Sequence, residues 1–184
     1  EQTASAEADA EAGQQAGGMQ ADNSLAKWQA EETEPDDGQK RKVYLTFDDG
    51  PSSNTDAILD ILKQYGVKAT FFVTGKPEEQ YKEMYQRIVE EGHTLGMHSY
   101  SHKYDEIYAS EEAFEEDLSR LQDFLYDTTG VWSHFYRFPG GSSNQVSTVD
   151  MSELAAYMQQ QDIYYLDWTC LLYTSPSPRD RQKS

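Results

Sequence analysis

Two adjacent carboxylates lie at the end of an apolar stretch, in Thr46-Phe47-Asp48-Asp49-Gly50-Pro51. Residues 41–47 are rich in β-branched and aromatic side chains and stop at a Gly-Pro pair, which predicts a β-strand. Successive side chains of a strand point to opposite sides, so Asp48 and Asp49 can perform different tasks. Two like charges this close are costly unless a cation lies between them, which makes a metal ion the candidate partner. Taken alone, such a run is as a rule a solvated turn, so the interpretation depends on residues further along.

Two imidazoles stand four residues apart, at His98 and His102. On a helical turn this spacing puts both side chains on one face, close enough to share a metal ion. With Asp49 they form a two-histidine, one-carboxylate set that leaves coordination positions open for water and substrate, as catalytic metal sites do. The alternative is a pair of partly exposed histidines with no role. The chain has only four histidines, and a carboxylate stands at another strand end, which favours the metal site.

A cation and a turn follow the predicted strand at 134–138, in Arg137-Phe-Pro139-Gly140-Gly141. A guanidinium beside Asp48 would keep that carboxylate ionised and oriented, whereas pairing with a surface acid is the alternative. Pro139 and the glycines would set a turn at which backbone N–H groups approach a ligand.

The elements that must position these residues alternate regularly from residue 41. Helices are expected to begin after Asn54, Pro77, Ser110 and Asp150. Strands are predicted over 41–47, 68–73, 94–97, 134–138 and 163–166. Alternation of strands and helices predicts a parallel sheet, either open or curled into a barrel. The candidate residues all fall at or just after the carboxyl ends of strands, which is where parallel α/β folds build their sites.

Apolar periodicity predicts which helix faces turn inward. The i, i+3, i+4, i+7 spacing is met in the first helix by Ile58, Ile61, Leu62 and Tyr65. In the long helix after Ser110 the expected inward residues are Phe114, Leu118, Leu121 and Leu125.

Composition narrows the class of protein. The chain has 184 residues, enough for one domain with a core, and a formal net charge of −18, which argues against nucleic acid as a partner. A single cysteine, Cys170, excludes an internal disulfide framework. No apolar run approaches the length of a membrane span, and the start at Glu1 without a signal peptide suggests a mature form or a fragment.

Residues 1–40 hold ten acids against two lysines and almost no aliphatic residues, which predicts a disordered acidic linker.

Together these motifs resemble one family, the polysaccharide deacetylases, also known as the NodB homology domain or family 4 carbohydrate esterases. Thr-Phe-Asp48-Asp49-Gly-Pro is similar to the family's first motif and His98-x-x-x-His102 to its second. Arg137-x-Pro139 is similar to the third motif, and Asp167-Trp168 to part of the fourth. The resemblance covers residues 42–168 and implies a distorted (β/α) barrel, incomplete at the C-terminus.

The resemblance also implies a reaction and a role for each residue. The reaction is hydrolysis of N-acetyl groups on a polysaccharide such as peptidoglycan or a chitin-like polymer. The implied cofactor is a divalent metal, most often zinc, and cobalt or nickel are the alternatives. Asp48 is then the catalytic base, Arg137 its orienting partner, and Asp167 a further catalytic residue. Asp49, His98 and His102 are the metal ligands. Substrate contacts are expected from Pro139, Gly140, Tyr100 and Trp168, with Tyr136 a further candidate for stacking on sugar rings; core packing is the alternative for each aromatic ring.

The resemblance stops after Trp168. The family's fifth motif, Leu-x-His, supplies a histidine as general acid, and neither His93 nor His134 stands in such a motif. Residues 169–184 turn basic and rich in Ser and Pro, which suggests a frameshift or read-through, with a natural flexible tail as the alternative. The expected organisation is therefore a linker over 1–40, a partial catalytic domain over 41–168 and an atypical tail over 169–184. Such a domain would expose a strand edge and have reduced or no activity.

Two other functions remain open at this point. A carbohydrate-binding pseudo-enzyme would keep the metal and the sugar contacts without hydrolysis, and an O-acetyl xylan esterase would use the same groups on an ester. The acidic linker suggests a domain held outside a bacterial cell or at its surface. The sequence leaves the sugar and the oligomeric state undetermined.

Overall fold

The computed structural model describes residues 43–168, and the predictions for 1–40 and 169–184 lie outside this part of the chain. Its centre is a parallel five-stranded sheet with the strands in chain order. The strands are β1 Thr46–Gly50, β2 Thr70–Thr74, β3 Thr94–Ser99, β4 Phe135–Tyr136 and β5 Tyr164–Tyr165. The helices are α2 Thr55–Tyr65, α3 Glu79–Glu90, α4 Tyr104–Ile107, α5 Glu111–Thr129 and α6 Met151–Gln160. The predicted alternation is confirmed, and the one-turn helix α4 is an addition to it.

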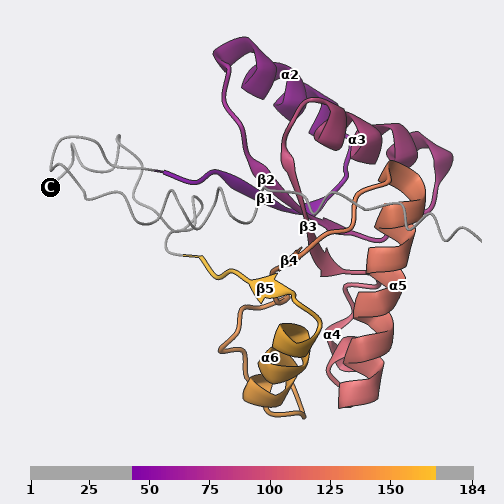
Figure 1. Ribbon diagram of the computed structural model, residues 1–184, viewed down its shortest axis with the longest axis vertical. Coiled ribbons are helices and arrows are strands. Elements are labelled where there is room, and N and C mark those ends of the chain that lie inside the picture. The colour runs from indigo at the N-terminus through magenta and orange to yellow at the C-terminus, as the bar shows by residue number, and fades with distance from the viewer. Residues whose placement is uncertain (1–42, 169–184) are drawn as a thin grey trace, which may run out of the picture. The chain divides into compact units, whose positions relative to one another are not determined.

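Helices cover the sheet in the order in which the chain supplies them. In Figure 1, α2 and α3 lie beside one another, α5 runs along the sheet past α3, and α6 lies next to β5. None of the helices within residues 43–168 is long and apolar enough to cross a membrane. Because every strand is parallel, all carboxyl ends meet at one edge of the sheet.

The long helix α5 follows its sequence pattern closely. Ser110 caps its first turn, with the hydroxyl accepting a hydrogen bond from the Ala113 N–H at 3.2 Å. Gly130 ends it in the left-handed conformation, which costs glycine no Cβ clash. The four predicted core positions are all at most 2% exposed: Phe114, Leu118, Leu121 and Leu125.

The predicted inward face of α2 is confirmed for Ile58 and Leu62 and is wrong for Ile61 and Tyr65. Ile61 and Tyr65 are 55% and 72% exposed, while Leu59 and Leu62 are buried. Apolar residues occupy two overlapping stripes on this short helix, so periodicity alone does not distinguish them. Packing of α2 against its neighbours buries Thr55, Leu59 and Leu62, so the inward stripe has the predicted spacing but begins three residues earlier.

The first and last strands are linked by a side chain. Arg137, which directly follows β4, donates from Nε to the Leu166 carbonyl at 2.9 Å and from Nη1 to the Thr46 hydroxyl at 2.7 Å. Within the described residues β1 and β5 do not pair as strands. The guanidinium nevertheless bridges the first residue of β1 and the residue that directly follows β5.

The opposite edge of the sheet holds the other two histidines. His93 directly precedes β3, is buried, and accepts a hydrogen bond at Nδ1 from the Ala69 N–H at 3.2 Å. His134 directly precedes β4, with its Nδ1 3.0 Å from the Asp162 carbonyl. Both therefore lie at the strand starts, away from His98.

Burial of His93 predicts a pH dependence of stability. Desolvation lowers the pKa of His93 below its usual value, and repulsion from the Lys68 ammonium lowers this pKa further. The unfolded chain takes up a proton near pH 6.5 that the folded chain resists, so the free energy of unfolding falls as pH drops through this value, by at most about 1.4 kcal/mol per pH unit. Urea unfolding at pH 7.5 and 5.5 should show a smaller loss for His93→Gln than for the unsubstituted chain. Equal losses in the two proteins would contradict the assignment.

Candidate metal centre and active site

Three predicted ligands converge at the carboxyl edge of the sheet. Nε2 of His98 and Nε2 of His102 each lie 3.2 Å from Oδ1 of Asp49. One ligand atom from each residue falls within 4.8 Å of the others. Ligand atoms held about 2.0–2.1 Å from one tetrahedral zinc ion lie roughly 3.3 Å apart. The spacing therefore fits a shared divalent ion, and the exposed Asp49 side leaves the cluster accessible from solvent.

The second ring nitrogen of His98 supports this assignment. His98 is buried, and its Nδ1 lies 2.6 Å from the Arg137 carbonyl. A carbonyl only accepts, so Nδ1 carries the proton and the lone pair is on Nε2, which faces Asp49. Histidines that bind metals commonly donate their other N–H to a carbonyl or carboxylate in this way. The buried imidazole is thus fixed in the tautomer that a metal ligand requires.

Proton sharing within the cluster shifts the pKa of both partners. The hydrogen bond from His102 is the largest effect on Asp49 and holds the pKa of this carboxylate well below its usual range, against the opposing effect of burial. The hydrogen bond to Asp49 in turn raises the pKa of His102. A metal ion and a proton on His102 would compete for the same nitrogen, so metal affinity should fall as the solution becomes more acidic.

The backbone that carries the ligands is irregular. Asp49 and His102 adopt left-handed conformations, with φ of 65° and 55°, which are uncommon for non-glycine residues. The β1–β2 register shifts between Asp48 and Gly50. The Lys76 ammonium donates to the Asp49 carbonyl at 3.1 Å and supports the chain there.

The predicted helical turn for the histidine pair is wrong. His98 lies within β3, whereas His102 lies in the loop between β3 and α4. The strand continues to Ser99, and the left-handed His102 then directs its ring back toward Asp49. The two imidazoles therefore meet through a loop reversal rather than through helical periodicity.

Asp48 has different partners from the neighbouring Asp49, as alternation along a strand predicts. Its Oδ1 accepts from Arg137 Nη1 at 3.0 Å, and its Oδ2 accepts from Trp168 Nε1 at 2.9 Å. Arg137 is 3% exposed and lies over the ring of Phe72, with 4.2 Å from its guanidinium carbon to the ring centroid. The predicted contact between Arg137 and Asp48 is present. The indole donor is an addition that sequence reasoning missed, because an indole after a strand usually indicates core.

The carboxylate of Asp167 contacts a turn rather than Asp48. Its Oδ1 accepts from the Ser142 N–H at 3.1 Å, and its Oδ2 accepts from the Ser142 hydroxyl. Pro139 is buried, and its carbonyl accepts from the Tyr108 hydroxyl at 2.8 Å. Gly140 is exposed, with φ of 80°, a conformation that glycine adopts without strain. Of these three residues, Gly140 is the one placed to approach a ligand.

The two other aromatic candidates differ in exposure. Tyr136 is 1% exposed and packs edge-on against Phe114, so it belongs to the core. Tyr100 is partly buried, with its ring centroid 3.8 Å from the Arg120 guanidinium carbon and its edge on Phe124. Its ring thus serves to pack the loop that carries His102.

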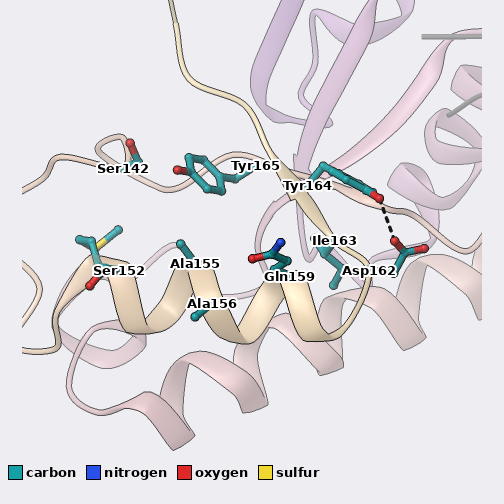
Figure 2. A pocket seen from close by; sticks show the side chains of 10 residues that line it. Ser142, Ser152, Ala155, Ala156, Gln159, Asp162, Ile163, Tyr164 and Tyr165 are labelled. Atoms are coloured by element: carbon teal, nitrogen blue, oxygen red, sulfur yellow. Dashed lines mark hydrogen bonds between the residues drawn. The ribbon is translucent and has the colours of Figure 1, made fainter. Parts of the chain in front are cut away.

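A groove of about 770 Å³ lies beside the site, between α6 and β5 (Figure 2). Its lining includes small side chains of α6 on one side and the two tyrosines of β5 on the other. The lining residues are Ser142, Met151, Ser152, Ala155, Ala156, Gln159, Asp162, Ile163, Tyr164 and Tyr165. None of them belongs to the metal cluster, and Ser142, through Asp167, joins the groove to the site edge.

The chain is similar in sequence and in fold to known proteins. The family model of polysaccharide deacetylase matches residues 36–158. The peptidoglycan-N-acetylglucosamine deacetylase of Bacillus cereus (strain ATCC 14579) is 35% identical over 130 residues, 70% of this chain and 47% of that protein. The solved catalytic domain of peptidoglycan N-acetylglucosamine deacetylase from Eubacterium rectale has 44% identity and a TM-score of 0.65, over 68% of this chain and 58% of that one. The Xyl-CE4 domain of a multidomain xylanase from the hindgut metagenome of Trinervitermes trinervoides has 33% identity and a TM-score of 0.58, over 73% of this chain and 60% of that one.

The chain belongs to the polysaccharide deacetylase family. The solved relatives also confirm the predicted α/β fold of the distorted-barrel type. The chain spans about half the length of the B. cereus relative and about three fifths of the solved chains. The family match at 36–158 includes the candidate metal ligands and Arg137, while Asp167 and Trp168 lie beyond it.

Proposed function

We propose that this chain hydrolyses N-acetyl groups on a glycan with the help of a divalent metal, and that peptidoglycan is the substrate class and zinc the ion. The observation that carries the proposal is the joint placement of two groups at one sheet edge. A cluster with metal-ligand spacing, Asp49 with the two histidines, stands directly beside an oriented carboxylate, Asp48. The relative from B. cereus and the relative from E. rectale are both named peptidoglycan N-acetylglucosamine deacetylases, which supports this substrate class.

Asp49, His98 and His102 would hold the ion. When bound, a divalent ion supplies Lewis acidity, which lowers the pKa of a water toward about 7 and polarises an acyl oxygen. Asp48 takes the proton of the attacking water as the general base and returns it to the leaving amine nitrogen as the carbon–nitrogen bond breaks, so that acetate and a free amine result. Arg137 and Trp168 orient that carboxylate, so the water meets an acceptor whose position is already set. At the exposed turn the Gly140 N–H would donate to the oxyanion of the tetrahedral intermediate, because the N–H groups of Gly141 and Ser142 already donate to the Phe138 carbonyl and to Asp167.

A second candidate reaction is de-O-acetylation of a xylan-type polymer. The likeness to the xylanase-linked domain favours it, because the attack on an acetyl carbonyl needs the same residues for an ester as for an amide. The substrate assay below separates the two reactions.

Acetate release tests the proposed function. The zinc-loaded chain should release acetate from N-acetylglucosamine oligomers and from peptidoglycan, and treatment with a chelator should abolish release. Faster release from acetylated xylan than from either N-acetylated polymer would favour the second candidate. No acetate from any of these substrates, with zinc bound stoichiometrically, would contradict both reactions and leave a glycan-binding domain.

A further inference from the structure

The loop that carries His102 is held by one carboxylate from another element. Asp117, on α5, accepts the Tyr100 N–H at Oδ2, 2.7 Å away, and the Ser101 N–H at Oδ1, 2.9 Å away. Its Oδ2 also accepts the Ser99 hydroxyl at 2.8 Å. That hydroxyl in turn accepts the His102 N–H at 2.8 Å. Three consecutive loop N–H groups are therefore satisfied directly or through Ser99 by a single side chain.

This arrangement restrains a backbone conformation that is not favourable by itself. His102 has φ of 55°, which costs a non-glycine residue energy unless its surroundings enforce it. Ser99 is fully buried, so its hydroxyl has a fixed position relative to β3 and to His98. The network thus connects the strand that carries one metal ligand to the loop that carries the other.

We propose that Asp117 is a positioning residue for metal binding, which sets the place of His102 relative to Asp49 and His98. The inference rests on the proposed function, because it presumes that the three-residue cluster binds a metal ion. Asp117 acts on the cluster indirectly, through the Ser99 hydroxyl and the N–H groups of the loop.

The chemistry requires a carboxylate at this position. All three groups that face Asp117 are donors, and a carboxylate presents acceptors only. An asparagine of the same shape would turn an N–H group toward at least one of these donors and leave it unsatisfied. The loop would then lose part of its restraint, while the helix that carries residue 117 keeps its shape.

Zinc affinity of the full chain tests the proposal. Because loss of a partner that orients a metal ligand typically weakens metal binding about 10–100-fold, we expect the zinc Kd of Asp117→Asn to rise by this factor. The visible absorption of bound Co²⁺ should change as well, because it reports ligand geometry rather than stability. Asp123→Asn is the matched control, since it makes the same change on an exposed position of the same helix. It should keep the Kd and the cobalt spectrum of the unsubstituted chain.

Each outcome decides the matter. An unchanged Kd and cobalt spectrum in Asp117→Asn would overturn the inference and leave the proposed function intact. Failure of the unsubstituted chain to bind zinc or cobalt would overturn the metal site of the proposed function, and the inference with it. If Asp117→Asn does not fold, Ser99→Ala replaces it, because this change removes only the acceptor of the His102 N–H and the donor to Asp117. Weaker zinc binding by Ser99→Ala supports the inference, and an unchanged Kd overturns it.

Discussion

Replacement of Asp48 by asparagine should lower kcat for acetate release by about 10²–10⁴-fold, the usual contribution of a general base. The amide cannot accept the proton of the attacking water at neutral pH. The metal ligands do not contact the Asp48 carboxylate, so stoichiometric zinc binding should persist in Asp48→Asn. Steady-state kinetics with zinc-loaded protein and an N-acetylglucosamine oligomer measure the effect.

Two controls make this result specific. Asp123→Asn, the exposed change on α5, should keep the unsubstituted kcat. Circular dichroism must show that Asp48→Asn is folded, because the substitution leaves the buried Arg137 guanidinium without its charged partner. Folded Asp48→Asn protein with undiminished kcat would show that another group is the base.

Removal of both imidazoles should abolish metal binding and activity together. In His98→Ala/His102→Ala only the exposed carboxylate of Asp49 remains of the cluster, and a single exposed carboxylate does not hold zinc at micromolar concentrations. We expect acetate release by the double variant to equal that of chelator-treated protein. Zinc added back should restore activity to the chelator-treated unsubstituted chain and not to the double variant.

His134→Ala provides the matched control for this experiment. The His134 side chain is 31% exposed, close to the 35% of His102, and it lies at the opposite edge of the sheet. The His134→Ala variant should bind one zinc ion and keep the activity of the unsubstituted chain. Equal loss of zinc in His134→Ala and in the double variant would show that the effect is not specific to the cluster.

Much of the site could be predicted because its chemistry is concentrated in short motifs at strand ends. Strand alternation predicts different partners for Asp48 and Asp49, and the structure shows them, although Asp49 with its φ of 65° departs from a regular strand. The place of Arg137 also follows from the parallel order, since its strand end must lie at the same edge as that of β1. Residue type and topology were sufficient for these three positions.

The remaining features depend on packing and on loop geometry. Two overlapping apolar stripes on α2 leave its inward face undetermined until its neighbours are known. Periodicity alone therefore does not predict that Ile61 and Tyr65 are exposed. A spacing of four residues is compatible with a helix, but the loop after β3 brings His98 and His102 together by a left-handed residue that no local pattern predicts. The contacts of Trp168 with Asp48, and of Asp117 with the loop, join residues far apart in sequence. Such contacts become visible only in three dimensions.

The most direct test of the central claim is the zinc stoichiometry and zinc K-edge absorption spectrum of the full chain, measured beside His98→Ala/His102→Ala. If Asp49, His98 and His102 form a metal centre, the unsubstituted chain will hold one zinc ion with two imidazole ligands, and the double variant will hold none. A chain that binds no zinc, or a double variant that binds it equally well, would contradict the metal centre and with it the proposed reaction.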